Sequence, residues 1–140
     1  MAYRSPPSFP VIVIALGGRV FGQEPSSGRR LWLHEAKETG AGSPVRVLVI
    51  GSTVYAAPLD HELRLLDYAT GRLLARTKIP HATGGTMMAV DGHIYLAGNG
   101  AIDCFGLDGQ LLWSDDFDGN NARAVSLAVP GYAVQGDLRS

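Results

Sequence analysis

Short apolar segments, separated by glycine-containing turns, recur along the whole chain. The clearest series predicts strands at Thr86–Val90, His93–Ala97, Ala101–Phe105 and Gln110–Ser114. Asp91-Gly92, between the first two of these segments, is a pair favoured in tight hairpin turns because both residues tolerate a positive φ. The pattern lacks the 3.6-residue period of an amphipathic helix, so it predicts an all-β fold.

The strand pattern repeats with a period of about 40 residues, which is typical of a propeller blade of four antiparallel strands. Gly28, Gly71 and Gly109 follow one another at roughly this interval. Trp32 and Trp113 lie two periods apart, each a few residues after its glycine. The sequence therefore predicts a partial β-propeller of about three four-stranded antiparallel blades with an extra C-terminal hairpin.

The chain is interpreted as a single repeat domain. Its blades are expected at about residues 11–34, 45–76 and 86–114, followed by a partial blade at about residues 124–135. The first blade shows only three clear strands, because the proline-rich stretch before Val11 suits a hydrogen-bonded strand poorly. The expected strand counts are therefore three, four, four and two.

The repeat resembles that of the PQQ-like (quinoprotein-type) propeller family. Each complete unit pairs an apolar residue with a tyrosine, as in Val54-Tyr55, and the second unit then carries an L-D-x-x-T-G turn at Leu66–Gly71. A Leu-Leu-Trp strand follows in the third unit and ends at Trp113. The resemblance covers about residues 11–137. It departs at Ala75, where the tryptophan is missing, and in the first unit, which lacks the Asp-Gly turn.

The resemblance implies that the repeat positions are architectural, with the tryptophan and the glycine turn locking neighbouring blades. These positions are Gly28, Trp32, Tyr55, Gly71, Tyr95, Gly109 and Trp113. A looser blade junction is expected at Ala75. Enzymes of the family bind PQQ and calcium through carboxylates and a stacking tryptophan, often beside a cysteine pair. The chain has one cysteine and no equivalent constellation, so no cofactor is expected and the chain is interpreted as non-enzymatic.

Composition narrows the classes of partner. The 140 residues are 46% hydrophobic and 18% charged, with a net charge of −1 and no basic block, which argues against disorder and against nucleic-acid binding. No apolar run approaches the ~20 residues of a membrane helix, so no membrane partner is expected. The single Cys104 fits a reducing compartment. Val11–Leu16 could imitate a signal peptide, but the run is short and preceded by prolines, so a cytoplasmic location is expected.

The chemistry-bearing residues show no catalytic or metal-binding spacing. None of the four histidines lies at a ligand spacing from another histidine or from Cys104: His34, His61, His81 and His93. The segment Asp115–Asn121 bends oxygen-bearing side chains around a glycine, as calcium loops do, but it lacks the EF-hand spacing and the terminal glutamate. Whether this segment binds a metal stays open at this stage.

An open stack of blades exposes sheet edges and apolar faces, which invite pairing. Two copies could close one ring, with each C-terminal hairpin (Ala124–Gln135) adding to the first blade of the other copy. The residues expected at that interface are Val125, Leu127, Val129, Tyr132 and Val134. Another propeller-containing protein could complete the ring instead, or the chain could be a fragment of a larger propeller.

These explanations lead to three hypotheses about function. The preferred hypothesis is a non-catalytic scaffold for protein or ligand binding that assembles as a homodimer. The first alternative is a subunit or fragment of a PQQ- or metal-dependent quinoprotein-like enzyme. The second is a structural half-propeller within a larger bacterial assembly.

Overall fold

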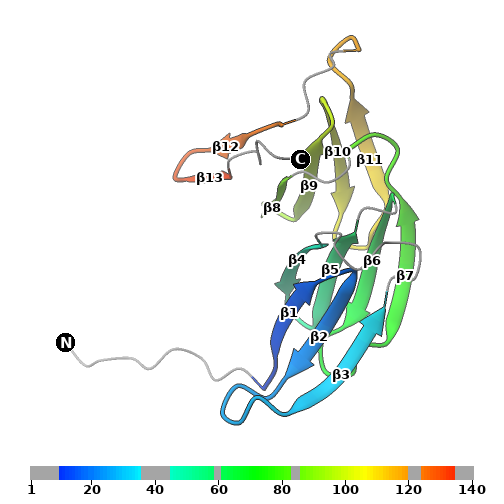
Figure 1. The fold of residues 1–140 in the computed structure, drawn as a ribbon. Coiled ribbons are helices and arrows are strands. Elements are labelled where there is room, and N and C mark those ends of the chain that lie inside the picture. Colours follow the sequence, from blue (N-terminus) through cyan, green and yellow to red (C-terminus); the bar gives the residue numbers. More distant parts are fainter. Residues whose placement is uncertain (1–9, 36–44, 59–60, 83–85, 120–123, 135–140) are drawn as a thin grey trace, which may run out of the picture.

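The computed structural model describes residues 10–35, 45–58, 61–82, 86–119 and 124–134, and every helix or strand assigned in these ranges is a β-strand. The strands form three antiparallel sheets and one short hairpin, which follow one another along the chain (Figure 1). The predicted all-β architecture is confirmed. The three sheets are called blade 1, blade 2 and blade 3 below.

In each blade the strands lie side by side in chain order. Blade 1 has three strands: β1 (Ile12–Leu16), β2 (Arg19–Gln23) and β3 (Arg30–Glu35). Blade 2 has four: β4 (Val45–Ile50), β5 (Thr53–Pro58), β6 (Glu62–Asp67) and β7 (Leu73–Lys78). Blade 3 also has four: β8 (Thr86–Val90), β9 (His93–Gly98), β10 (Ala101–Gly106) and β11 (Leu111–Asp115). The C-terminal hairpin pairs β12 (Leu127–Val129) with β13 (Tyr132–Val134).

The tight turns form where the glycines stand. Asp91 and Gly92 have φ angles of 51° and 75°, so this pair adopts the left-handed conformation that the sequence predicts. Blade 1 lacks an Asp-Gly pair, and Gly17-Gly18 takes its place with φ angles of 57° and 74°. The first strand of the hairpin is shorter than the predicted range, since β12 begins at Leu127 rather than Ala124.

Each blade carries one β-bulge near the start of its last strand, at Leu31, Leu74 and Leu112. The register shifts after Gly22 in blade 1, after Leu65 in blade 2 and after Cys104 in blade 3, which makes these three residues equivalent. A gapless alignment of blades 1 and 3 would instead place Phe21 on Ile102, and this is wrong by one residue. The cause is the turn that follows, which is one residue shorter in blade 3: its closing hydrogen bond joins Gly106 to Gln110, whereas the turn in blade 1 is closed between Glu24 and Arg29.

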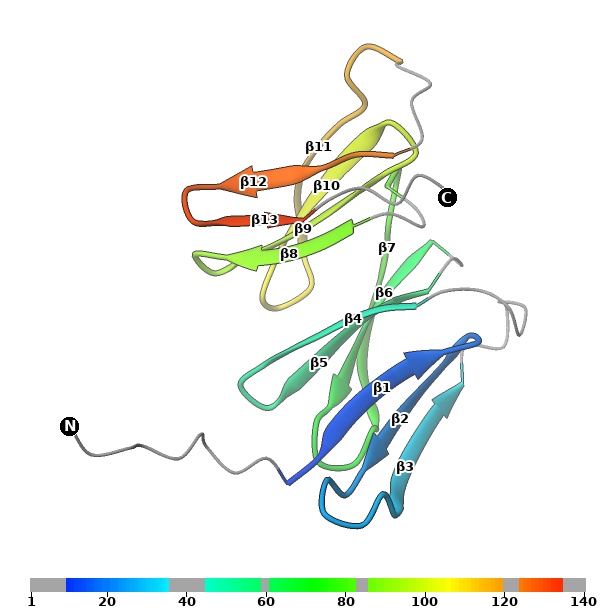
Figure 2. The same cartoon turned by 60° about the vertical axis from the view of Figure 1, so that its left-hand side comes forward.

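The core lies between the blades, which stack face to face (Figure 2). One apolar cluster joins blade 1 to blade 2 and includes Val20, Trp32 and Val54. A second cluster joins blade 2 to blade 3 and includes Leu63 and Phe105, both fully buried. Each of these sheets therefore gains stability by covering a face of its neighbour, as expected of stacked repeats.

Candidate assembly surfaces

The junction between blades 1 and 2 is locked by one tryptophan. Trp32, on β3, is only 7% exposed, and its indole Nε1–H donates to the carbonyl oxygen of Tyr68 at 3.0 Å. The ring lies against Gly22 and Gly71: a Cβ added to either glycine would come within 2.2 Å and 2.4 Å of ring atoms. Gly71 also has a φ of 74°, so both space and backbone conformation require glycine there.

The junction between blades 2 and 3 uses a tyrosine instead. Ala75 occupies the tryptophan position. Tyr55 lies two strands away in the same cross-strand row, and its hydroxyl donates to the carbonyl oxygen of Leu107 at 2.7 Å. Leu65, between them in the same cross-strand row, lies 3.1 Å from where a Cβ on Gly109 would stand. Tyr55 thus makes the turn contact at this junction that Trp32 makes at the junction between blades 1 and 2, and a looser junction at Ala75 stays a prediction.

A buried carboxylate holds the crossing from blade 2 to blade 3. Asp103, on β10, is 0% exposed, and its Oδ2 accepts hydrogen bonds from the backbone N–H groups of His81 and Ala82 at 3.0 and 2.7 Å. The His81 ring nitrogen Nδ1 lies 3.4 Å from the other carboxylate oxygen. These bonds satisfy a charge that would otherwise be costly to bury, so Asp103 serves the architecture.

Blade 3 presents the tryptophan face of such a junction without its partner turn. A cross-strand row runs from Met88 through Tyr95 and Cys104 to Trp113. Met88 and Cys104 are buried and Tyr95 is half-buried, whereas Trp113 is 47% exposed. Tyr95 and Trp113 contact each other with ring centroids 6.1 Å apart. The inner part of this face is covered, and its outer, aromatic part is open.

The C-terminal hairpin covers the inner part of that face. The Thr86 hydroxyl, on β8, donates to the carbonyl oxygen of Val125 at 3.2 Å, just before β12. Val125, Leu127 and Val129, expected at an interface from the sequence, are all half-buried. Tyr132 and Val134, from the same prediction, belong to β13, and their side chains lie outside the described part of the structure.

Blade 1 presents the other half of a junction, a glycine turn without its tryptophan. The turn Glu24–Arg29 repeats Asp67–Arg72 bond for bond: Gly28 N–H donates to Glu24 O at 2.8 Å, and Gly71 N–H donates to Asp67 O at 2.7 Å. Gly28 has a φ of 76°, against 74° for Gly71. A Cβ on Gly28 would meet nothing within 4 Å, so this turn is shaped like the occupied one but uncovered.

The outer face of blade 1 around this turn is apolar. Ile12 and Leu16 on β1 are at least half exposed, and Leu33 on β3 is partly exposed. Phe21, between them, is nearly buried because the Arg30 guanidinium lies over its ring, 4.8 Å from the centroid. An exposed apolar sheet face of this kind is typical of a surface that another element covers.

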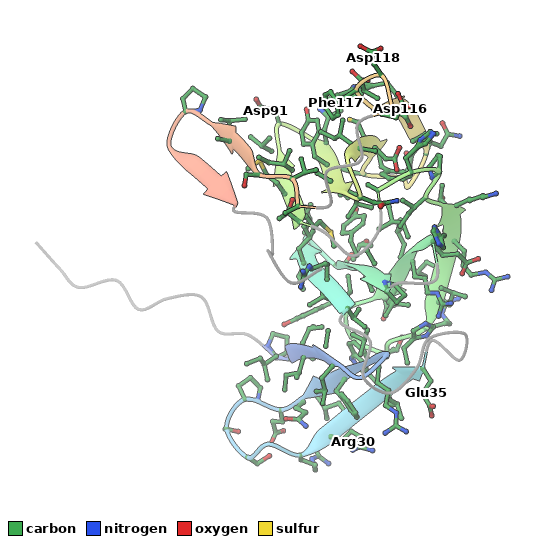
Figure 3. The ribbon with its side chains drawn as sticks, turned by 45° about the horizontal axis from the view of Figure 1, so that its top comes forward. Arg30, Glu35, Asp91, Asp116, Phe117 and Asp118 are labelled. Carbon is green, nitrogen blue, oxygen red and sulfur yellow. The ribbon has the colours of Figure 1, made fainter. Side chains whose placement is uncertain are left out.

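The two ends of the molecule differ in charge. Arg30 lies at the blade 1 end, and Asp116 and Asp118 lie at the blade 3 end (Figure 3). The stretch from Gly106 to Gly119 contains four aspartates and no lysine or arginine. In the predicted calcium-like loop, Asp115 Oδ1 accepts a hydrogen bond from the Phe117 backbone N–H at 2.8 Å, while Asn120 and Asn121 fall outside the described residues.

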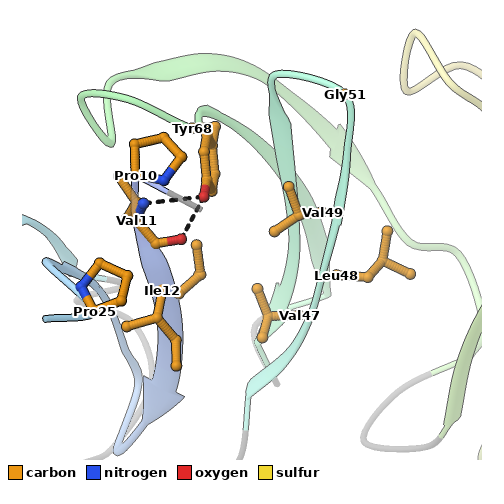
Figure 4. A pocket seen from close by; sticks show the side chains of 10 residues that line it. Pro10, Val11, Ile12, Pro25, Val47, Leu48, Val49, Gly51 and Tyr68 are labelled. Carbon is orange, nitrogen blue, oxygen red and sulfur yellow. Dashed lines mark hydrogen bonds between the residues drawn. The ribbon is translucent and has the colours of Figure 1, made fainter. Parts of the chain in front are cut away.

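A cavity of about 720 Å³ lies between β1 and β4 (Figure 4). Its walls are apolar and come from the start of β1, from Val47–Val49 on β4 and from Pro25. Tyr68 closes one end: its hydroxyl donates to Val11 O and accepts from Val11 N–H, the latter at 3.1 Å. Both the hydroxyl and the carbonyl of Tyr68 are thus engaged in holding blade 1 on blade 2.

Titratable groups within the described ranges do not assemble into a metal site, since no three His, Cys, Asp or Glu side chains gather there. Cys104 is fully buried, and this burial raises the pKa of its thiol. Burial also raises the pKa of Tyr95. No helix in the described residues could span a membrane. The most distinctive features of the described surface are therefore the two unmatched halves of a blade junction.

Sequence reasoning identified the tryptophans and the glycine turns but missed three contributors. Gly22 stands in the middle of a strand where the other blades have Leu65 and Cys104, and an isolated strand glycine signals close approach of another group. The Tyr55 hydroxyl contact and the position of Arg30 over Phe21 have no signal in a single sequence, because both depend on which faces of the blades meet.

Solved structures with similar folds place this arrangement among known proteins. BamB from Moraxella catarrhalis matches 89% of this chain and 39% of its own, with a TM-score of 0.62 and 17% identity. Quinohemoprotein alcohol dehydrogenase from Comamonas testosteroni matches 76% of this chain and 19% of its own, with a TM-score of 0.60 and 17% identity. The computationally designed Ika4 protein matches 91% and 79%, with a TM-score of 0.67 and 20% identity.

No protein family matches the sequence, and no curated protein does either. The structural likeness, at 20% identity or less, establishes the fold alone: a partial β-propeller. The chain spans well under half the length of BamB and of the dehydrogenase.

Proposed function

We propose that the chain is a non-catalytic propeller module, two copies of which join end to end into one closed ring that serves as a binding scaffold. One observation carries the proposal. The chain contains a complete tryptophan-and-turn junction at Trp32 and Gly71, and it exposes both halves of a second one, at Trp113 and Gly28. A second copy can supply each half to the other.

The occupied junction defines how the open one closes. Trp32 donates to the carbonyl of Tyr68, the second residue of the blade 2 turn. The equivalent residue in the blade 1 turn is Pro25, so Trp113 of one copy donates to Pro25 O of the other and covers Gly28. The indole, half exposed in the single chain, thereby becomes buried with its N–H satisfied, as buried tryptophans require.

Charges on the two faces support the same pairing. In the occupied junction His34, two residues beyond Trp32, contacts Arg64 of the next blade at 3.1 Å. The equivalent of His34 on blade 3 is Asp115, and the equivalent of Arg64 on blade 1 is Phe21, which Arg30 covers. The acidic Asp115 of one copy therefore comes opposite the basic Arg30 of the other. Such complementarity favours the correct partner and steers association.

Two copies with three blades each give six blades, within the four to eight that close a propeller ring. Each copy contributes one Trp113 face and one Gly28 turn, so the two interfaces are identical and the ring has two-fold symmetry. Turns carried on this rigid scaffold, and the central channel, are the surfaces on which a protein or small ligand would bind. The proposal gives the chain no cofactor and no catalytic step.

The test is the solution mass of variants at matched concentrations. Trp113→Ala should weaken the dimer at least about thirtyfold, because truncating a central interface tryptophan typically costs about 2 kcal/mol or more. Leu112→Ala is the matched control: Leu112 is 51% exposed beside Trp113 but lies in the bulge, off the cross-strand row. Equal effects of the two substitutions would contradict the proposed contact.

Charge reversal tests the partner directly. Asp115→Lys alone and Arg30→Glu alone should each weaken the dimer, because both interfaces then juxtapose like charges. In a mixed dimer of the two variants both interfaces are complementary again, because one carries the native Asp115–Arg30 pair and the other carries the same pair with its charges reversed. An equal mixture should therefore regain association. Single variants that dimerise as tightly as the unmodified chain, while each is folded by circular dichroism, would exclude this pairing.

A further inference from the structure

Blade 1 lacks its innermost strand in the described part of the chain. Blades 2 and 3 begin with β4 and β8, each followed after a tight turn by β5 or β9. Blade 1 begins with β1, which is equivalent to β5 because Val13 and Tyr55 pair with Gly22 and Leu65, the equivalent residues after which the register of each blade shifts. The edge of β1 that faces away from β2 is therefore where a first strand would pair.

The neighbouring blade shows what that missing strand would cover. Val47 and Val49 on β4 share the face whose neighbours Ala56 and Val54 pack against blade 1. Val49 is 42% exposed, whereas its equivalent Ala89 on β8 packs in the cluster between blades 2 and 3. The apolar cavity of about 720 Å³ between β1 and β4 lies over these valines. It has the position and lining of a slot for one apolar strand.

We propose that β12 of the second copy fills this slot, pairing antiparallel with β1 and completing blade 1 as its first strand. This inference rests on the proposed two-copy ring and names the segment that completes it. The hairpin identifies β12 as a first strand: the turn Pro130-Gly131 follows it, as Gly51-Ser52 follows β4. The hairpin also lies beside blade 3, where the next blade belongs: Val125, just before β12, accepts a hydrogen bond from Thr86, and β13 lies against β8.

The side chains of β12 suit the slot. Leu127 and Val129 are equivalent to Leu48 and Ile50, which point toward the following blade. In the ring they point toward β4 of the partner and cover its exposed Val49. The residues that alternate with them, Ser126 and Ala128, are small and face blade 3 of their own copy, which precedes this strand in the ring. Half-buried Leu127 and Val129 thus gain an apolar contact that the single chain does not give them.

The exchange of strands has a low cost. In the single chain β12 pairs with β13 over three residues on each strand. In the ring it leaves β13 and pairs with β1, which offers five residues. By equivalence with β4 and β5, Ala128 comes opposite Ile12 and Ser126 comes opposite Ile14 of the other copy. Exchange of an identical element between copies is a common route to dimers.

Disulfide trapping tests this register. In a Cys104→Ala background, chains with Ile14→Cys are mixed with chains with Ser126→Cys and mildly oxidised. These two positions are chosen because residues directly opposite each other on paired strands lie within the roughly 4.4–6.8 Å Cα separation of disulfides. We expect a covalent dimer on a non-reducing gel. The matched control mixes Leu16→Cys with Ser126→Cys, two residues out of register, and should cross-link at least tenfold more slowly.

The outcomes separate the two proposals. The strand exchange is overturned if the chain is a dimer by light scattering but Ile14→Cys and Ser126→Cys never cross-link. It is also overturned if the control pair cross-links equally well. Either result leaves the two-copy ring standing. Chains that stay monomeric at all concentrations overturn both. Deletion of residues 127–140 gives a second readout: strand exchange predicts a loss of at least tenfold in dimer affinity, and an unchanged affinity contradicts it.

Discussion

Two glycines at the same position of the same turn allow the tryptophan junction to be measured by difference. Gly71 and Gly28 have φ angles of 74° and 76° and identical turn hydrogen bonds. They differ in surroundings: a Cβ on Gly71 would lie 2.4 Å from the Trp32 ring, and a Cβ on Gly28 would meet nothing within 4 Å. Alanine therefore imposes the same backbone strain at both positions but displaces an indole at only one.

The magnitudes follow from these contacts. Left-handed backbone at a residue with a Cβ costs roughly 1–2 kcal/mol, which is the whole effect expected for Gly28→Ala on the folding of a single chain. Gly71→Ala adds the displacement of Trp32, whose complete truncation would cost about 3–5 kcal/mol, and the loss of its hydrogen bond to Tyr68 O, worth about 1 kcal/mol. Partial retention of the ring contacts gives an expected total of about 3–5 kcal/mol for Gly71→Ala.

Urea unfolding in a Trp113→Ala background, at low concentration to avoid association, gives both free energies of unfolding. The predicted difference between the two variants is about 2–3 kcal/mol. Equal destabilisation by the two substitutions would mean that the turn conformation, and not the Trp32 indole, requires glycine at position 71. The proposed two-copy ring adds a further expectation: Gly28→Ala should weaken association, because its methyl group would occupy the place proposed for Trp113 of the second copy.

Other predictions concern single residues. Asp103→Ala should lower the free energy of unfolding by about 3 kcal/mol or more, because two buried N–H groups lose their acceptor. Asp103→Asn should lower this free energy by less. Urea unfolding compares the two variants. Tyr55→Phe should cost about 1 kcal/mol in the same assay through loss of the bond to Leu107 O, and no loss would contradict the tyrosine junction. Burial raises the pKa of the Cys104 thiol in the folded chain. The protonated thiol therefore contributes its full stability below about pH 8.5, the pKa of an unfolded cysteine, and this contribution is lost as the pH rises above that value. In thermal melts at alkaline pH the unmodified chain should lose stability faster than Cys104→Ala.

Much of the fold could be predicted from the sequence because the repeat is local. Short strands, Asp91-Gly92 and the recurring glycine turns each depend on a few adjacent residues, and the structure forms them where expected. The exact equivalence of blades 1 and 3 was not predictable, because the turn before the last strand is one residue shorter in blade 3 and a single sequence does not show where that residue is missing. A gapless alignment therefore misplaces Phe21 by one residue.

The sequence identified the residues of the candidate site but not which of them are covered. Trp32 and Trp113 occupy the same repeat position, so sequence assigns both the same role. Their environments differ because Trp32 has a neighbouring turn and Trp113 does not among the described residues. The cavity between β1 and β4 and the proposed pairing of Asp115 with Arg30 likewise depend on which faces of the packed blades lie open.

The most direct test of the two-copy ring is the solution mass of the unmodified chain, measured by light scattering coupled to size exclusion at two concentrations. A two-copy ring requires a mass near twice the 14.8 kDa of one chain at both concentrations. A soluble species with the mass of a single chain throughout, folded by circular dichroism, would contradict it. The Trp113 face and the Gly28 turn would then have to be covered by a different polypeptide.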